Sequence, residues 1–192
     1  MYRRARPFAL PLQKIVDNRS NPQLRYKLSE SQNAILAEIV QHPGIRFKEL
    51  SRHTGYAHGV LTYNLNVLER ENSINKIRHN KTTRYYSHYI PNQDIKILSH
   101  LRINSERDLI LFVLDHDLCT FNEVVVYSGK APSTISWHLK RLCEDGVISI
   151  RTGEFNLYRL VNKELVIHML HKYKESFTDQ IVNNFVNIAN EL

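Results

Sequence analysis

The chain has 192 residues, of which 42% are hydrophobic and 23% are charged, and its net charge is +7. These proportions are those of an ordinary globular protein, and they exclude a fibrous or intrinsically disordered chain. No uninterrupted apolar run approaches the ~20 residues needed to cross a bilayer, and the N-terminal apolar stretch is too short for a signal peptide. We therefore expect a cytoplasmic protein without a membrane partner.

The positive charge is unevenly distributed along the chain. Residues 1–28 carry seven Lys or Arg and one acid, and residues 29–102 carry ten and six. Residues 103–162 carry six Lys or Arg and eight acids, whereas residues 163–192 carry three and four. The surplus lies in the N-terminal half, where a polyanion would be held most strongly.

Residues 1–28 predict a basic N-terminal arm. Three prolines favour an extended chain with at most one helical turn. Arg3, Arg4 and Arg6 could lie along a phosphate backbone or in a minor groove. The alternative is an unstructured tail that keeps the protein soluble.

The chain contains an internal repeat. Residues 31–74 align without a gap with residues 105–148, at a constant offset of 74. The matched pairs include Phe47 with Phe121, Glu49 with Glu123, Gly55 with Gly129, Leu65 with Leu139, Leu68 with Leu142, and Ile74 with Ile148. An offset that never slips indicates two copies of one folding unit.

The first copy, residues 29–90, predicts three helices and a hairpin. Ser29 or Ser31 caps the first helix, and Gly55 provides the turn between the second helix and a third that starts near Ala57. Two alternating strands, 74–77 and 84–88, follow that helix. This order is typical of a winged helix-turn-helix, whose third helix commonly enters a DNA groove.

The rest of the chain predicts a connector, a second copy and a terminal helix. Residues 91–103 form a helical connector, and residues 104–162 repeat the unit with wing strands at 147–151 and 155–160. The expected fold is mainly α with small β-hairpin wings: two tandem winged helix-turn-helix domains plus a long C-terminal helix over residues 163–192.

An apolar stripe runs along the predicted C-terminal helix at a mean spacing close to the 3.6 residues of a helical turn. Its members are Val166, Leu170, Tyr173, Phe177, Ile181, Phe185, Ile188 and Leu192. The stripe either covers both repeats or pairs with the same helix of a second chain. We favour the pair, and thus a homodimer, because two-fold symmetry suits palindromic DNA.

Each predicted third helix leaves a polar face outside once its leucines and isoleucine turn inward. The first face carries His58, Gly59, Thr62, Tyr63, Asn66 and Arg70. The second carries Ser133, Thr134, Ser136, Trp137, Lys140 and Arg141. These side chains offer the donors, acceptors and methyl groups that base edges and phosphates require.

The predicted wings differ in charge. The first tip has Arg78, Lys81 and Arg84 as candidate phosphate or minor-groove contacts, whereas the second has Arg151 and Arg159 beside the acidic Glu154. We therefore expect the first repeat to dominate affinity for DNA. Solvated hairpins without a binding role are the alternative.

Two segments carry a family resemblance. The run APSTISWHLKRLCEDGVI, residues 131–148, resembles the recognition helix and first wing strand of ArsR-like bacterial and archaeal transcriptional regulators. The run HPGIRFKELSRHTGYAHGVLTYNLNVLE, with RYY at residues 84–86, is similar to archaeal regulators built from two winged helices in tandem. The resemblance covers about residues 29–162 and implies a DNA-binding fold. Where such families often have His in the reading helix, the first repeat has Asn64 and the second has His138.

The sequence predicts neither an enzyme nor a cofactor. It contains no P-loop, GxGxxG, GxSxG or HExxH motif. His168 and His171 have no nearby carboxylate or cysteine and are expected at the surface, while His42 and His116 are expected near helix C-termini. Cys119 and Cys143 show no CxxC spacing, so buried reduced thiols are expected and no metal site.

These observations predict a sequence-specific, double-stranded-DNA-binding transcriptional regulator. The alternative is a winged-helix scaffold that binds proteins, which the near-neutral second repeat could serve. Binding of RNA or single strands would need more exposed aromatic residues than Tyr63 and Trp137.

Overall fold

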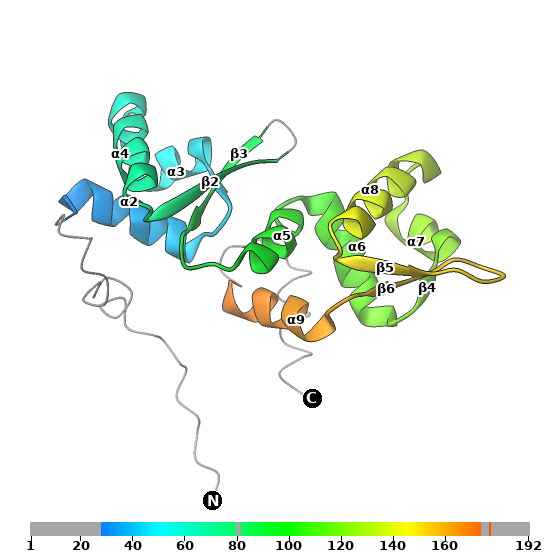
Figure 1. Cartoon of the computed structure of the whole chain (residues 1–192). Coiled ribbons are helices and arrows are strands. Elements are labelled where there is room, and N and C mark those ends of the chain that lie inside the picture. Colours follow the sequence, from blue (N-terminus) through cyan, green and yellow to red (C-terminus); the bar gives the residue numbers. More distant parts are fainter. Residues whose placement is uncertain (1–27, 80–81, 174–176, 178–192) are drawn as a thin grey trace, which may run out of the picture.

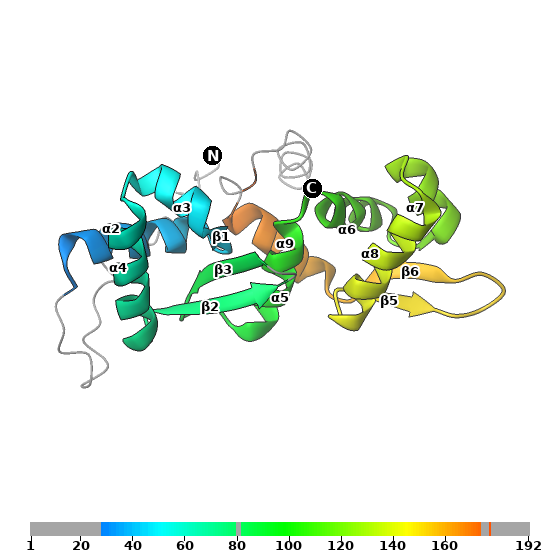
Figure 2. The same ribbon diagram turned by 90° about the horizontal axis from the view of Figure 1, so that it is seen from above.

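The computed structural model describes residues 28–79, 82–173 and 177. Their elements form two units that lie side by side along the long axis of the molecule, with α5 and α9 between them (Figures 1 and 2). The helices of the first unit are α2 (Glu30–Gln41), α3 (Phe47–Thr54) and α4 (His58–Arg70). Its strands are β1 (Ile45–Arg46), β2 (Ile74–His79) and β3 (Thr82–Ser87), which form an antiparallel sheet in the order β1-β3-β2.

The second unit has the same order of elements after a connecting helix, α5 (Asn92–Leu101). It comprises α6 (Asn104–His116), β4 (Cys119–Thr120), α7 (Phe121–Ser128), α8 (Pro132–Glu144), β5 (Ile148–Arg151) and β6 (Leu157–Leu160). The sheet order is β4-β6-β5, which corresponds to that of the first unit. A last helix, α9 (Lys163–Lys172), follows.

Local sequence explains where these helices begin and end. Ser29 caps α2, because its hydroxyl accepts a hydrogen bond from the backbone of Gln32 and the Gln32 side chain accepts one from the Ser29 backbone. Gly55 and Gly129 end α3 and α7 with φ of 71° and 61°, a left-handed conformation that suits glycine. These boundaries agree with the sequence-based prediction.

Two hydrophobic cores meet at strand β3. Tyr85 belongs to the core of the first unit, with Ile35, Ile39 and Leu65 among its members. Tyr86 points to the opposite side of the strand and belongs to the larger core formed by α5, the second unit and α9. Both sides of β3 are therefore covered, and this strand joins the two units.

The strands differ from the prediction in length and number. The hairpin β2–β3 extends about two residues further toward its tip on each side than the alternating pattern suggested. In the second unit β6 begins at Leu157 instead of residue 155, so its turn is longer. The two-residue strands β1 and β4 were not predicted, because two residues are too few to show an alternating pattern.

The predicted dimer seam is wrong for its first four residues. Val166, Leu170, Tyr173 and Phe177 are all buried in the core that α5, the second unit and α9 form within one chain. Furthermore, α9 ends at Lys172 and Phe177 lies outside any helix, so the predicted helix is not continuous. Ile181, Phe185, Ile188 and Leu192 lie outside the described residues, as does the N-terminal arm.

Both cysteines are free thiols, as the sequence predicted. Cys119 is buried and lies in β4, where its thiol is 3.8 Å from the Tyr158 carbonyl oxygen, and Cys143 is half-buried in α8. Burial raises the pKa of the Cys119 thiol to about 11, with a further contribution from Glu123, so this thiol is protonated at neutral pH. Among the described residues, no helix is long and apolar enough to cross a membrane.

Candidate nucleic-acid interface

The outer face of α4 is open to solvent. Leu61, Leu65 and Leu68 pack into the first core, which fixes the rotation of the helix about its axis. Tyr63 on the opposite side is 67% exposed. The other exposed residues of that face are His58, Gly59, Asn66 and Arg70, and Thr62 is half-buried. The structure thus brings the first predicted set together on one surface.

The first turns of α4 are held by one contact to α3 and by side-chain contacts within the helix. The ring of His58 lies 4.8 Å from that of Phe47, the first residue of α3, and its Nδ1 is 3.5 Å from the hydroxyl of Thr62. Asn64, which faces inward, donates a hydrogen bond to the carbonyl of Val60. These contacts position the start of the helix, where winged-helix proteins commonly meet base edges.

Helix α8 presents a similar face in the second unit. Pro132 occupies its first turn, where the missing N–H costs nothing, and Ile135, Leu139 and Leu142 are buried beneath it. Trp137 is 51% exposed. The other exposed members of the predicted set are Ser133, Thr134, Ser136 and Lys140.

Arg141 does not belong to this open face, contrary to the prediction. Its side chain is only 13% exposed, and its Nη1 lies 2.6 Å from Oε1 of Glu106, which is fully buried. Its guanidinium also lies 4.7 Å from the centre of the Trp137 ring. Arg141 therefore makes a cation–π contact with the exposed indole ring of Trp137.

A buried polar network, which no local sequence pattern indicates, lies beneath α8. His138 Nδ1 is 3.1 Å from Oε1 of Glu106, and His100 Nδ1 is 2.7 Å from Oε2 of the same carboxylate. The other ring nitrogen of His100 is 2.9 Å from Asp145 at the end of α8. The network therefore links the connector α5, the first helix of the second unit and the candidate reading helix.

The environment of Glu106 favours its ionised form. Burial would raise the pKa of this carboxyl group, but hydrogen bonds from His100 and His138 and the positive charge of Arg141 bring it below its ordinary value of 4.5. A buried carboxylate with these partners is satisfied at neutral pH. It fixes the position of α8 relative to α6.

The first wing holds only part of its predicted basic cluster. Arg78 on β2 is exposed, and Lys81 lies outside the described residues. Arg84 is buried instead of lying at the tip: its Nη1 donates to the carbonyl of Gly44 at 2.7 Å and its Nη2 to that of Arg102 at 3.4 Å. The prediction that Arg84 contacts phosphate is wrong, because the side chain stabilises the junction between the units.

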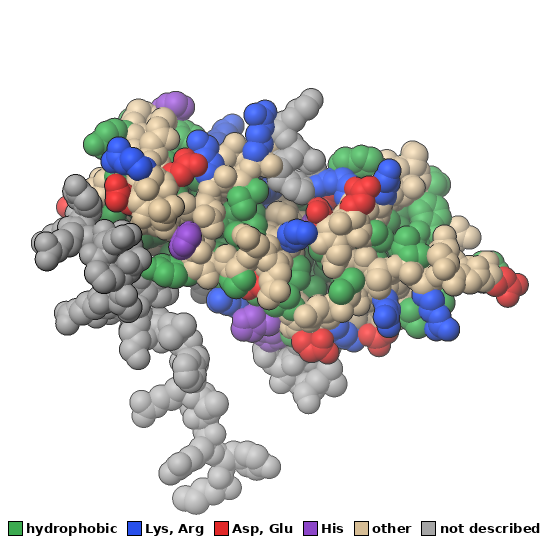
Figure 3. Space-filling view, in the orientation of Figure 1, with side chains coloured by type: hydrophobic (Ala, Val, Ile, Leu, Met, Phe, Trp, Pro, Cys, Tyr) green, Lys and Arg blue, Asp and Glu red, His purple; other side chains and the backbone are tan. Residues whose placement is uncertain are grey.

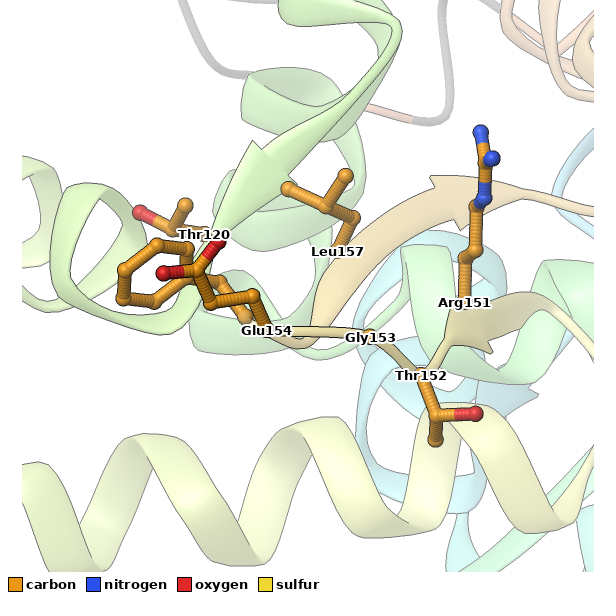
Figure 4. Close-up of a pocket in the computed structure, with 7 residues that line it drawn as sticks. Thr120, Arg151, Thr152, Gly153, Glu154 and Leu157 are labelled. Carbon is orange, nitrogen blue, oxygen red and sulfur yellow. The ribbon is translucent and has the colours of Figure 1, made fainter.

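The second wing is mixed in charge, as its sequence suggested. Arg151 and Glu154 are both exposed and line a shallow hollow of about 350 Å³ with Thr120 and Phe155. Figure 4 shows the Arg151 guanidinium pointing away from Glu154. Arg151 therefore remains open to a ligand, although an acidic group lies near it.

An exposed cation–acid pair lies near the C-terminal end of each candidate reading helix, α4 and α8. Arg70 Nε lies 3.4 Å from Glu71, and Lys140 Nζ lies 3.8 Å from Glu144. Such exposed pairs are weak in water and can open when a stronger anion approaches. On the face shown in Figure 3, Lys and Arg side chains are interspersed with acidic ones along both units.

Comparison with known proteins shows that the first unit is similar to an HTH domain. A family model described as an N-terminal HTH domain matches residues 29–98. The chain is also similar to the uncharacterized HTH-type transcriptional regulator MJ1398 of Methanocaldococcus jannaschii, with 23% identity over 139 residues. That match covers 72% of this chain and 30% of the relative, so this chain corresponds to less than a third of the relative's length.

Two solved structures are weakly similar. HlyU from Vibrio cholerae has 18% identity and a TM-score of 0.39, over 43% of this chain and 90% of its own. A conserved hypothetical protein from Chlorobium tepidum has 15% identity and a TM-score of 0.26, over 73% of this chain and 95% of its own. The family match covers the first unit and most of α5, and it does not extend to the second unit.

Proposed function

We propose that the chain is a sequence-specific regulator of transcription that binds double-stranded DNA, and that both units are winged helix-turn-helix domains in tandem. The observation that carries this proposal is the outer face of α4, which exposes Tyr63, Asn66 and Arg70 within the segment that matches an HTH domain. The side chains on this face are donors, acceptors and an aromatic ring.

The proposed mechanism places α4 in a major groove. Asn66 pairs with an adenine edge and Arg70 with a guanine edge or a phosphate, because these side chains match the donor and acceptor pattern of those bases. Arg78 on the wing contacts the backbone and sets the register. Helix α8 supplies hydroxyl groups, Trp137 and Lys140 to a second, weaker contact.

A gel-shift titration with a random-sequence duplex tests this proposal. We expect Arg78→Ala to weaken duplex binding and to reduce the slope of log affinity against log salt by about 0.9, the value for one lost phosphate contact. Lys96→Ala, which removes an exposed charge on α5, is the matched control and should leave the slope unchanged. Equal slopes for Arg78→Ala and wild type would refute the wing contact, and absence of salt-dependent binding would refute the function.

Selection from a library of random duplexes tests the base contacts. Wild type should enrich a defined sequence, and Asn66→Ala should relax the preference at one position at a cost of about 1–3 kcal/mol. Enrichment of no sequence, or stronger binding to single strands than to duplex, would contradict sequence-specific recognition of double-stranded DNA.

A protein-binding role for the second unit is the second candidate function. Besides Tyr127 and Trp137, this unit exposes four large side chains that have no polar atom, namely Leu118, Val126, Ile150 and Phe155, and Val126 is 81% exposed. Apolar side chains at the surface favour a protein partner over a nucleic acid. If Lys140→Ala and Trp137→Ala leave duplex affinity unchanged while Asn66→Ala weakens it, α8 does not contact DNA, and the exposed apolar side chains of the second unit remain available to a protein partner.

A further inference from the structure

Three side chains at the junction of α2 and α3 offer metal-binding atoms to one point. Glu38 and His42 lie one helical turn apart at the end of α2, and His53 lies in the last turn of α3. Oε2 of Glu38 is 3.0 Å from Nδ1 of His53 and 3.8 Å from Nε2 of His42. One donor atom from each residue lies within 4.8 Å of the other two.

The chemistry of this set is specific. Two neutral imidazoles and one carboxylate form a donor set that zinc and its neighbours in the first transition series accept, with a fourth position left for water. Ca²⁺ and Mg²⁺ prefer oxygen atoms alone. The set therefore discriminates between classes of divalent ion.

The surroundings suit an ion that enters from solvent. The side chains of His42, Glu38 and His53 are 16%, 29% and 42% exposed, so the cluster is anchored at one end and open at the other. The His42 and His53 rings meet edge to face with centres 5.1 Å apart. Donor atoms around a tetrahedral zinc ion are roughly 3.3 Å apart at bond lengths near 2.0 Å. Side-chain rotations that shift the donor atoms by about an ångström would therefore complete the site.

We propose that Glu38, His42 and His53 bind one divalent transition-metal ion of the zinc class and so clamp α2 to α3. His42 also directly precedes the residues at which the connector contacts the first unit. Its neighbours Pro43 and Gly44 accept hydrogen bonds from Arg102 and Arg84, the side chains that hold the connector against the first unit. The bound ion fixes the residue that precedes this junction.

Titration of the full, untagged chain with Co²⁺ tests the proposal, after a chelator has removed bound metal. We expect one equivalent of Co²⁺ to produce the visible absorption of a tetrahedral centre, and one equivalent of Zn²⁺ to displace it. His53→Gln should weaken binding by at least roughly a hundredfold, because loss of even an outer-shell partner costs 10–100-fold. His53 is exposed enough for this variant to fold, which circular dichroism checks.

The double variant His168→Gln with His171→Gln is the matched control, since it removes two imidazoles from α9 and leaves the cluster intact. It should bind one equivalent as wild type does. The proposal fails if wild type shows no saturable one-equivalent binding, or if His53→Gln binds as tightly as wild type. In either case the cluster is only a hydrogen-bonded imidazole–carboxylate group. The measurement contains no DNA, so its outcome is independent of the proposed regulatory function.

Discussion

Three consecutive residues of β3 serve different parts of the molecule. Tyr85 packs in the first core, whereas Arg84 and Tyr86 face the connector and the second unit. Because Arg84 donates to two carbonyl oxygens from separate segments, its removal would leave buried acceptors unpaired, at a cost of about 1–3 kcal/mol each. The Arg84 guanidinium therefore belongs to the junction between the units, although the residue lies in a wing strand.

Gly44 lies at the same junction, next to the ring of Tyr86. Its φ is 78°, and an added Cβ would lie 3.1 Å from the hydroxyl oxygen and 3.2 Å from a ring carbon of Tyr86. Burial raises the pKa of that hydroxyl group to about 12 despite the nearby charges of Arg84 and Arg102, so it stays neutral at physiological pH. The close approach of backbone and ring requires a residue without a side chain.

Glu106→Gln should destabilise the protein strongly at neutral pH. The substitution removes the negative charge that His100, His138 and Arg141 share, and loss of one partner from a buried ion pair costs about 3–5 kcal/mol. Folding lowers the pKa of Glu106, so its contribution is complete above the unfolded-state value and is lost as the pH falls through the folded-state value. Wild type and variant should therefore converge in acid.

Urea unfolding at neutral pH and in acid, followed by circular dichroism, measures this difference. Glu154→Gln, which changes an exposed acid on the second wing, should match wild type at each pH. A constant gap between Glu106→Gln and wild type over the whole pH range would show that the carboxylate charge is not the source of the effect.

The helices of both units could be predicted from sequence because each signal is local. The glycines at the ends of α3 and α7 and the buried leucines of α4 and α8 appear at fixed spacings. The role of Glu106 could not be predicted, because an acid in the first turn of a helix is usually solvated and its partners lie 6, 32 and 35 residues away. The candidate faces follow from helical geometry. Arg84 and Arg141 were wrongly predicted to be exposed, because the period of a helix or strand does not show which other elements cover a given face.

The turns between the second and third helices of both units demand glycine for conformational reasons alone. Gly55 and Gly129 have positive φ, and an added Cβ would meet nothing within 4 Å. We therefore expect Gly55→Ala to lower the free energy of unfolding by about 1–2 kcal/mol, the cost of a left-handed conformation for an L residue. Gly44→Ala should cost more, since it combines this conformation with a steric contact.

Thermal unfolding of the single variants checks this expectation. Gly59→Ala, in the first turn of α4 with open space around its Cβ position, is the matched control and should be as stable as wild type or more so. If Gly55→Ala were no less stable than Gly59→Ala, the left-handed turn would not govern the end of α3.

Of the two cores formed by the described residues, the larger depends on α9. In α9, Val166, Met169 and Leu170 close the core that α5 and α6 form, and Phe177 lies under Arg102 and Arg107 with guanidinium distances of 5.7 and 5.9 Å from its ring centre. Arg102 contacts both this ring and the Pro43 carbonyl. Arg102 thus links Phe177 to the first unit.

Leu170→Ala distinguishes a core role from a dimer seam. Because Leu170 is 2% exposed in a single chain, its truncation leaves a cavity and should lower the free energy of unfolding by about 2–5 kcal/mol. Sedimentation velocity should show the same association state for variant and wild type at equal concentration, since the side chain contacts its own chain. Val161→Ala, at an apolar position that is 58% exposed, should change stability by no more than about 0.5 kcal/mol. A Leu170→Ala variant that dissociated without losing stability would return this residue to an interface between chains.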